Sequence, residues 1–293
     1  MTRAAQLIRD GGLVAFPTET VYGLGANALD DKAVARIFQV KGRPSSSPLI
    51  VHVTDEEMAR SVTAEWPEIA RSLAARFWPG PLTLVLPKAA SIPDIVTAGL
   101  NTVGVRVPAH PIAHELIRRA GLPIAAPSAN RFTEVSPTTA DHVRAVLGDR
   151  VDTIIDGGPT QVGIESTVVS LVRAQPAILR PGMITARELE HATGVPWTSN
   201  PTGANLSESP GLHPRHYAPR TAFYVLERGQ TRPKGRGLIL DMPHDPIAYA
   251  ATLYARVRQA DAEGWDWIAV NKPPDAPEWA GILDRLRRAT TPR

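Results

Sequence analysis

The fold is decided by residues 12–53, GLVAFPTETVYGLGANALDDKAVARIFQVKGRPSSSPLIVHV. The apolar run from Leu13 to Phe16 is too short for most helices and ends at Pro17, which predicts a buried strand. A loop rich in hydroxyl groups and glycine is expected to follow, from Thr18 to Gly25.

A helix is predicted after this loop. Asp30 or Asp31 can cap its N-terminus, and its apolar face is Val34, Ile37 and Phe38. The helix ends in a basic turn with three serines, KGRPSSSP at residues 41–48, and a second apolar run follows from Leu49 to Val53. A strand, a glycine-bearing loop, a helix and a strand place polar groups at the rim of a sheet. Open α/β sheets bind their ligands at such rims.

The composition is that of an ordinary soluble globular protein, with 293 residues, 43% hydrophobic residues and a mean hydropathy of −0.12. This length favours two domains over one. No apolar run approaches the ~20 residues of a membrane span, and residues 1–12 lack the apolar core of a signal peptide, so a cytoplasmic protein is expected. The absence of cysteine excludes disulfides, thiolate metal sites and a cysteine nucleophile.

The net charge of +3 is unevenly distributed. Residues 1–210 carry 19 Lys and Arg against 20 Asp and Glu, whereas residues 211–293 carry 13 against 9. Attraction of a polyanion by bulk charge would therefore lie in the C-terminal part. The excess is small and is typical of an ordinary solvated surface.

Three segments are predicted along the chain. Residues 1–190 alternate short apolar runs with helical segments, which indicates one α/β domain with a large, twisted, mixed sheet and flanking helices. Residues 191–220 are rich in proline and glycine and are expected to form a linker or a long ordered loop. Residues 221–293 predict a second, small α/β unit in the order strand, strand, helix, strand, helix.

The basic turn is the first candidate site. Lys41 and Arg43 flank Gly42. An ordinary helix end has the same pattern, because cations favour helix C-termini and glycine often ends a helix. The serines that follow and the two prolines that stiffen the turn favour a second interpretation, a site for phosphate oxygens. Ser128 and Asn130, after another short strand, are weak candidates by themselves because both are common turn residues.

His52 and Arg106 lie in alternating strands that contain valine. Each is expected on the face opposite its branched neighbours, so that each is either solvated or paired in a cleft. The sequence lacks a G-x-S-x-G elbow, an H-E-x-x-H motif, a carboxylate cluster and a Walker motif. Phosphate binding by dispersed cations and hydroxyl groups is the remaining chemistry.

Five blocks together resemble a known family: PTETVYGL at 17–24, KGRP at 41–44, PLIVH at 48–52, PSAN at 127–130 and ESTV at 165–168. Their order and spacing are similar to those of the YrdC-type threonylcarbamoyl-AMP synthases. SPG at 209–211 and HYAP at 216–219 resemble the linker of the long form of this family, which carries a second, Rossmann-like domain. The resemblance implies a YrdC-like sheet for residues 1–190, a lid for 191–220 and a small Rossmann-like domain for 221–293.

The resemblance also implies a nucleotidyltransferase reaction, in which L-threonine, bicarbonate and ATP give threonylcarbamoyl-AMP and pyrophosphate. It places threonine at Thr20, His52, Arg106, the backbone around Ala126, and Ser166. It places ATP at Lys41, Arg43, Ser47, Thr102, Ser128, Asn130, Ser136, Arg180 and, from the linker, Tyr217. Lys41, Arg43, Ser128 and Asn130 are the residues expected to carry catalysis. Mg²⁺ would be held mainly through ATP, and a separate transferase complex would use the product to modify tRNA.

Two alternatives remain beside this hypothesis. A carbamoyltransferase of the hydrogenase-maturation type contains a similar domain, but it needs zinc fingers and a cysteine, which this chain lacks. A double-stranded RNA-binding module without catalysis is the other alternative, and the near-neutral charge of residues 1–210 argues against it. Binding of tRNA as a secondary property stays open. The C-terminal unit looks shorter than the family's second domain.

Overall fold

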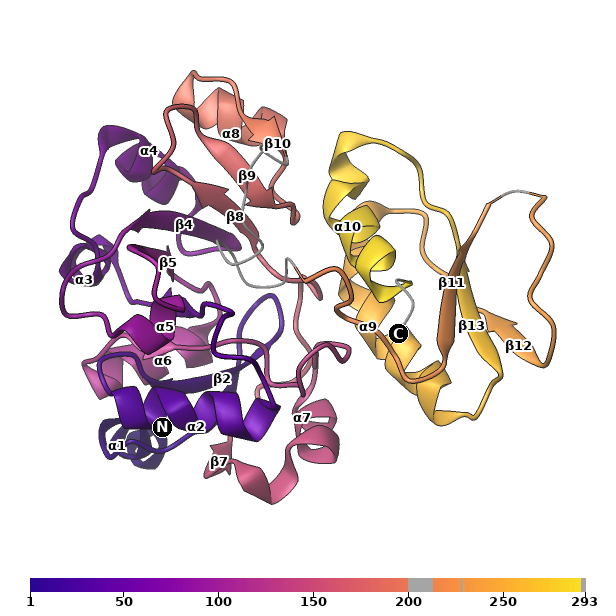
Figure 1. Ribbon diagram of the computed structural model, residues 1–293, viewed down its shortest axis with the longest axis horizontal. Helices are drawn as coiled ribbons and strands as arrows, with labels where there is room; N and C mark the ends of the chain where they lie inside the picture. Colours follow the sequence, from indigo (N-terminus) through magenta and orange to yellow (C-terminus); the bar gives the residue numbers. More distant parts are fainter. Residues whose placement is uncertain (200–212, 228, 291–293) are drawn as a thin grey trace.

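The computed structural model describes residues 1–199, 213–227 and 229–290, and in that part of the chain it contains two sheets (Figure 1). The large sheet is mixed. Its strands, in order across the sheet, are β10 (Thr198–Ser199), β9 (Ala177–Arg180), β8 (Thr167–Ser170), β4 (Leu82–Pro87), β5 (Thr102–Arg106), β3 (Ile50–His52), β6 (Ile124–Ala125), β2 (Tyr22–Asn27), β1 (Val14–Pro17) and β7 (Thr153–Ile154). The predicted fold class is therefore confirmed.

Helices flank this sheet. They are α1 (Thr2–Arg9), α2 (Asp31–Lys41), α3 (Glu56–Val62), α4 (Glu68–Phe77), α5 (Asp94–Thr97), α6 (Pro111–Ala120), α7 (Ala140–Val146) and α8 (Ala186–Thr193). Alternate residues of β1 belong to different cores. Ala15 packs in the cluster that contains Val34 of α2, whereas Phe16 packs in the cluster that contains Ile8 of α1 and Leu116 of α6. Successive strand residues point to opposite faces, so helices cover both faces of the sheet.

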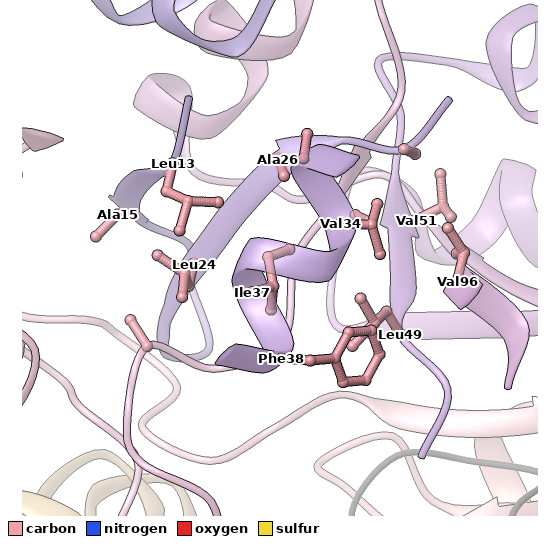
Figure 2. Packing of buried hydrophobic residues seen from close by; sticks show 14 of the residues in the cluster. Leu13, Ala15, Leu24, Ala26, Val34, Ile37, Phe38, Leu49, Val51 and Val96 are labelled. Atoms are coloured by element: carbon pink, nitrogen blue, oxygen red, sulfur yellow. The ribbon is translucent and has the colours of Figure 1, made fainter. Parts of the chain in front are cut away.

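The predicted helix of the decisive stretch is confirmed as α2. The Asp30 side chain accepts hydrogen bonds from the backbone N–H groups of Lys32 and Ala33, which caps the first turn. Val34, Ile37 and Phe38 are buried against the sheet, as Figure 2 shows. The helix ends at Gly42, whose φ of 60° is a left-handed conformation that favours glycine.

The prediction of a loop as far as Gly25 was wrong. Residues from Tyr22 onward form β2, which pairs antiparallel with β1, and only residues 18–21 connect the two strands. A Cβ atom on Gly25 would lie 2.6 Å from the Phe16 ring. The glycine is therefore needed for the packing of Phe16, which local sequence signals do not reveal.

The C-terminal unit has the predicted order of elements. Strands β11 (Ala222–Leu226), β13 (Trp267–Asn271) and β12 (Gly237–Ile239) form a parallel sheet, and the helices are α9 (Pro246–Ala262) and α10 (Ala280–Ala289). One face of this sheet shares a core with both helices through Phe223, Ile268, Val270, Leu253 and Ile282. This is the small Rossmann-like domain that the sequence predicts.

The two domains approach each other closely at two glycines. Gly163, with a φ of 80°, lies against α9, where an added Cβ would be 2.3 Å from the carbonyl oxygen of Ala250. Gly281 of α10 lies against Gly182. A Cβ atom added to Gly281 would be 2.6 Å from the carbonyl oxygen of Gly182. Figure 1 shows α9 and α10 on the side of the small domain that faces the large one.

Part of the predicted linker is also described. Strand β10, at Thr198–Ser199, extends the large sheet by pairing with β9, and residues 213–220 lead into the second domain. The linker motif at residues 209–211 lies outside the described residues. Among the described helices, we find none with the length and apolar character required to cross a membrane.

Candidate active site

A cavity of about 50 Å³ lies where β1, β3, β5 and β9 end, where β8 begins and where the linker returns. The sequence-predicted residues that line it are Thr20, Arg43, His52, Arg106, Ala126, Ser128, Ser166, Arg180 and Tyr217. Its other lining residues are Thr18, Val21, Gly23, Ile50, Pro127, Glu165 and His216. Segments that are far apart in the sequence therefore meet at one cavity.

One side of the cavity is built on neighbouring strands. Parallel pairing of β3 with β5 sets His52 opposite Arg106, and both side chains are buried. Arg106 donates from Nη1 to Thr20 Oγ1 at 3.0 Å and from Nε to the carbonyl oxygen of Gly80 at 3.1 Å. Burial, together with the charge of Arg106, lowers the pKa of His52 to about 3. The imidazole is therefore neutral at physiological pH.

Arg106 also has a partner that the sequence analysis missed. Its Nη2 lies 2.7 Å from Glu19 Oε1, and both side chains are buried. Nevertheless, within the described residues Nη2 and both Glu19 oxygens lack a well-aligned hydrogen bond, and His52 Nδ1 also has none. Buried polar atoms are normally satisfied, so this side of the cavity has unused hydrogen-bonding capacity. Glu19 stands in the quoted block at 17–24, but no feature of that block separated it from a surface glutamate.

A second set of lining residues is cationic. Arg43 donates from Nη2 to Ser47 Oγ at 2.5 Å and to the carbonyl oxygen of Pro48 at 3.0 Å. Burial lowers the pKa of Arg43 to about 10, which leaves it charged at physiological pH. Arg180 donates to the carbonyl oxygen of Ser166 from Nε at 3.2 Å and from Nη2 at 3.0 Å. Ser47 does not line the cavity and instead holds Arg43.

Lys41 lies behind the turn that contains Ser128 and Asn130. Its Nζ donates to the carbonyl oxygen of Ser128 at 2.5 Å and also to that of Asn130. Burial, with a smaller effect from Arg43, holds the pKa of Lys41 well below its ordinary value. Asn130 donates from Nδ2 to two backbone carbonyl groups, whereas its buried Oδ1 has no hydrogen-bond partner among the described residues. Neither Lys41 nor Asn130 is on the cavity wall.

Two further residues that were predicted to bind ATP, Ser136 and Thr102, do not line the cavity. Ser136 donates from Oγ to Glu165 Oε1 at 2.5 Å, so it contacts a lining residue. Thr102 begins β5, four residues before Arg106, and is half-buried. At ~3.3 Å per strand residue, the two are about 13 Å apart along the strand, and the structure does not bring Thr102 to this cavity.

The linker closes the cavity with two aromatic side chains. His216 and Tyr217 are buried, with ring centroids 4.1 Å apart. Burial raises the pKa of Tyr217, so its hydroxyl group is protonated, but within the described structure that hydroxyl has no hydrogen-bond partner. The guanidinium of Arg285 lies 5.1 Å from the centre of the Tyr217 ring. Sequence reasoning predicted Tyr217 here and missed the role of His216 beside it.

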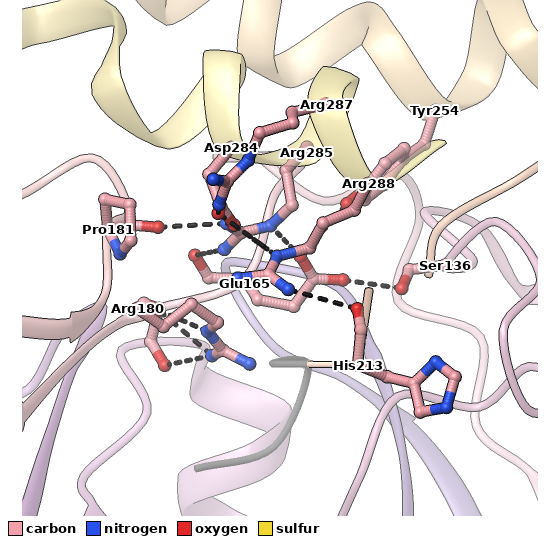
Figure 3. A network of polar contacts seen from close by, with 11 residues as sticks. Ser136, Glu165, Arg180, Pro181, His213, Tyr254, Asp284, Arg285, Arg287 and Arg288 are labelled. Atoms are coloured by element: carbon pink, nitrogen blue, oxygen red, sulfur yellow. Dashed lines mark hydrogen bonds and ion pairs between the residues drawn. The ribbon is translucent and has the colours of Figure 1, made fainter. Parts of the chain in front are cut away.

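Glu165 is another lining residue that the sequence left without a role. Figure 3 shows it between the two domains, where it accepts hydrogen bonds from Ser136, from Tyr254 of α9 and from Arg285 of α10. Burial raises the pKa of Glu165, but Arg285, Arg180 and the hydrogen bonds outweigh burial and bring it below the ordinary value. Glu165 is therefore a buried carboxylate. No local signal marks Arg285, which stands among the other arginines of α10.

Comparison with known proteins agrees with this architecture. A family model described as "Telomere recombination" matches residues 6–182, and one described as "Threonylcarbamoyl-AMP synthase, C-terminal domain" matches residues 184–291. Threonylcarbamoyl-AMP synthase of Pyrococcus abyssi is 42% identical over 98% of this chain and 93% of its own length. That of Bacillus subtilis is 41% identical over 99% of this chain and 92% of its own length.

The fold extends the likeness to the whole molecule. The crystal structure of the Pyrococcus abyssi protein Sua5 complexed with L-threonine has a TM-score of 0.91 to this structure and 40% sequence identity. It covers 99% of this chain and 93% of that one. The chain therefore belongs to the threonylcarbamoyl-AMP synthases, a class of nucleotidyltransferases. Within that family it is the form with both a YrdC-type domain and a C-terminal domain.

Proposed function

We propose that this chain joins L-threonine, bicarbonate and ATP into threonylcarbamoyl-AMP and pyrophosphate by means of the cavity described above. The observation that carries the proposal is that two kinds of polar group line the same cavity. His52 and Arg106 leave buried polar atoms without aligned partners, and Arg43 and Arg180 supply further positive charge. The first group suits an amino acid, and the second suits phosphate groups.

The reaction needs no nucleophile from the protein. The neutral amine of threonine adds to carbon dioxide derived from bicarbonate, forms the new C–N bond and loses a proton to give a carbamate. A carbamate oxygen then attacks the α-phosphorus of ATP, and the bond to pyrophosphate breaks with its electron pair on the leaving oxygen. The protein is left to position the reactants and neutralise charge.

We assign the residues to these tasks as follows. Arg106 binds the threonine carboxylate, because its Nη2 is the part of the guanidinium without an aligned hydrogen bond, and Thr20, His52, Ser166 and the backbone at Ala126 complete that subsite. Arg43 and Arg180 face the phosphates, supported by Ser47, Ser128 and Ser136. Lys41 acts through the turn it holds, and Tyr217 covers the nucleotide. Thr102 is the member of the ATP set for which the cavity offers no support.

Magnesium is proposed as the metal. Among the described residues no group of three or more His, Cys, Asp or Glu could hold an ion. A hard cation of this kind is carried mainly by phosphate oxygens and water, and the buried Oδ1 of Asn130, two residues after Ser128 of the wall, is an oxygen donor without a partner among the described residues. When bound, the ion would offset the charge that accumulates on pyrophosphate. The protein residues would then only orient the loaded nucleotide.

The test is pyrophosphate release by the purified protein with ATP, Mg²⁺ and bicarbonate, with and without L-threonine. We expect release that requires both threonine and bicarbonate and that falls at least ~100-fold in Lys41→Ala, because the turn loses two charge-assisted hydrogen bonds of about 1.5–3 kcal/mol each. Lys32→Ala, an exposed residue at the start of the same helix, is the matched control. Release that does not depend on threonine would refute the proposed acceptor.

Two extensions belong to the same proposal. Residues 191–220 would act as a lid over a catalytic domain of residues 1–190, with 221–293 as the second domain. Tyr217→Ala should then weaken ATP binding, and unchanged ATP affinity and turnover would refute the lid. The unstable product would pass to a tRNA threonylcarbamoyl transferase complex in the cytoplasm, where ATP and tRNA are found. Pull-down of that complex, with and without direct tRNA binding, tests the handover.

A further inference from the structure

We propose that Arg285 of the C-terminal domain is a positioning residue of the nucleotide site, which allows the buried Glu165 carboxylate to hold Ser136 beside the ATP phosphates without repelling them. The inference rests on the proposed function. It assigns to the second domain a direct electrostatic part in ATP binding. The argument depends on the contacts of Glu165, on the balance of charge around it and on the way α10 is docked.

The contacts of Glu165 come from both domains (Figure 3). Oε1 accepts from Ser136 Oγ at 2.5 Å, and Oε2 accepts from Tyr254 at 3.0 Å and from Arg285 Nε at 2.7 Å. Arg285 Nη2 also donates to the backbone carbonyl oxygen of Glu165 at 3.2 Å. Arg285 therefore hydrogen-bonds both the side chain and the main chain of Glu165, the residue next to Ser166.

Glu165 would be unfavourable in this place without compensation. It lines the cavity, it is 7% exposed, and ATP brings several negative charges to the same cavity. A buried carboxylate that loses its cation is costly and repels anions. Arg285 is completely buried, so its charge is little screened. The ion pair with Arg285 offsets the repulsion between Glu165 and phosphate, so that Glu165 can accept the hydrogen bond that orients the Ser136 hydroxyl group.

Arg285 is itself held in place by its own domain. Asp284 accepts from Arg285 Nη1 at 2.9 Å and also from Arg287 and Arg288 of the same helix. Arg285 Nη1 also donates to the carbonyl oxygen of Pro181, next to Arg180. Arg258 of α9 donates to the carbonyl oxygen of Ser136 at 3.2 Å. The helices of the second domain thus contact both Ser136 and Glu165 directly.

The charged and titratable groups that face Glu165 come from five elements. They are Lys41 from α2, Arg180 from β9, Tyr254 from α9, Asp284 and Arg285 from α10, and Tyr217 from the linker. Lys41, Arg180 and Arg285 are the cations of this set, and Arg285 is the one that contacts the carboxylate. Removal of Arg285 therefore changes Glu165 more than removal of any other member of the set.

The experiment compares Arg285→Met with the double variant Glu165→Gln/Arg285→Met. Calorimetry measures binding of Mg²⁺ and a nonhydrolysable ATP analogue between pH 6 and 8.5, and pyrophosphate release gives separate KM values for ATP and L-threonine. Arg287→Met is the control, because Arg287 lies on the same helix, bonds the same Asp284, and has a side chain that is 65% exposed. Melting temperatures are recorded for all variants.

We expect Arg285→Met to weaken ATP binding about tenfold or more, with less than a twofold change in KM for threonine. Its ATP affinity should improve as the pH falls, because the Glu165 carboxylate then binds a proton and its repulsion disappears. The double variant should recover ATP affinity to within about threefold and lose this pH dependence. Arg287→Met should match the unaltered protein.

Normal ATP binding by Arg285→Met, or equal impairment of the single and double variants at every pH, overturns the inference and leaves the proposed function intact. Should Arg285→Met fail to fold, the double variant decides: near-normal ATP affinity supports the inference, and weak binding by the folded double variant overturns it. Failure of the unaltered protein to bind ATP overturns both proposals together. A purely structural role of Arg285 would not produce the pH-dependent recovery.

Discussion

Two buried arginine–glutamate pairs, one within the large domain and one between the domains, have the same N–O distance of 2.7 Å. In the pair of Arg106 with Glu19, both carboxylate oxygens and Arg106 Nη2 lack an aligned hydrogen bond among the described residues. In the pair of Arg285 with Glu165, Nε donates to a carboxylate that also accepts from Ser136 and Tyr254. The two ion pairs therefore have equal N–O distances, but only the pair of Arg106 with Glu19 has unused hydrogen-bonding capacity among the described residues.

This difference in hydrogen bonding distinguishes a pair that can bind a ligand from a pair that holds neighbouring side chains in place. Unaligned, buried polar atoms cost free energy unless a ligand satisfies them, so the pair in the large domain offers a donor, Arg106 Nη2, and two acceptors, the Glu19 oxygens, to a polar ligand. A fully bonded pair has nothing left to offer a ligand and instead holds its neighbours in place. Under the proposed function, the large domain would supply contacts to substrate, whereas the small domain would supply the support that fixes part of the wall.

The largest expected effect comes from breaking the pair in the large domain. Arg106→Gln leaves Glu19 buried without a cation, which should cost about 3–5 kcal/mol of unfolding free energy. Threonine-dependent release of pyrophosphate should fall about 10- to 100-fold, because the charge-assisted hydrogen bond from Nη2 to the carboxylate, about 1.5–3 kcal/mol, is lost. Urea unfolding and steady-state kinetics measure the two effects.

The double variant Glu19→Gln/Arg106→Gln sharpens the comparison. It should recover most of the lost stability and none of the threonine dependence, whereas the equivalent double variant at the domain interface should recover ATP affinity. If neutralising Glu19 restored threonine-dependent turnover, the two pairs would have the same role and the distinction would be wrong.

An intermediate effect is expected where α9 rests on the large domain. Gly163→Ala places a Cβ atom 2.3 Å from the Ala250 carbonyl oxygen, and its φ of 80° is unfavourable for alanine. Gly264→Ala is the matched control, since its φ is 73° and no atom lies within 4 Å of an added Cβ. The control should lose about 1–2 kcal/mol through the backbone alone, and Gly163→Ala about 1–3 kcal/mol more through overpacking.

Steady-state kinetics test whether the docking of α9 also affects the nucleotide site. Gly163→Ala should also raise the KM for ATP relative to Gly264→Ala, because displacement of α9 moves Tyr254 away from Glu165. Equal stability of the two variants, or an unchanged KM in a destabilised Gly163→Ala, would show that docking of the second domain does not set the nucleotide site.

The smallest effect concerns two histidines, His52, which is buried, and His142, which is half-buried. Burial lowers the pKa of His52 to about 3 and that of His142, beside α9, to about 4, with further contributions from Arg106 and Arg258 respectively. Both folded-state values lie below the ordinary value of 6.5, so the unfolded chain binds more protons in between. Stability should therefore be complete well above pH 6.5 and fall as the pH drops toward 4, by about 1.4 kcal/mol for each histidine at pH 5.5.

Urea unfolding at pH 7.5, 6.5 and 5.5 checks this sign. His142→Gln should remove part of the acid sensitivity without changing threonine binding, because its ring bonds Thr138 and lies away from the cavity. His52→Gln should remove a similar part and also weaken threonine binding. A stability that stays flat from pH 7.5 to 5.5 would contradict both assignments.

Much of the fold follows from local signals in the sequence. Apolar periodicity and the Asp30 cap predicted α2, and alternation along β5 placed Arg106 opposite its valines. The elements of the second domain appeared in their predicted order for the same reason. The strand β2 was not predicted, because its Gly25 is required by the Phe16 ring, a contact that forms only after the two strands pair.

The candidate site divides in the same way. The sequence by itself determined the residue types and the motif blocks, and through them the family and most of the cavity wall, including His52, Arg106 and Tyr217. Only the tertiary structure decided that Glu19 pairs with Arg106, that Lys41 lies behind the wall, and that Arg285 reaches Glu165 across 120 residues of chain. Buried ion pairs depend on which distant segments exclude water together, and no local pattern in the sequence records that.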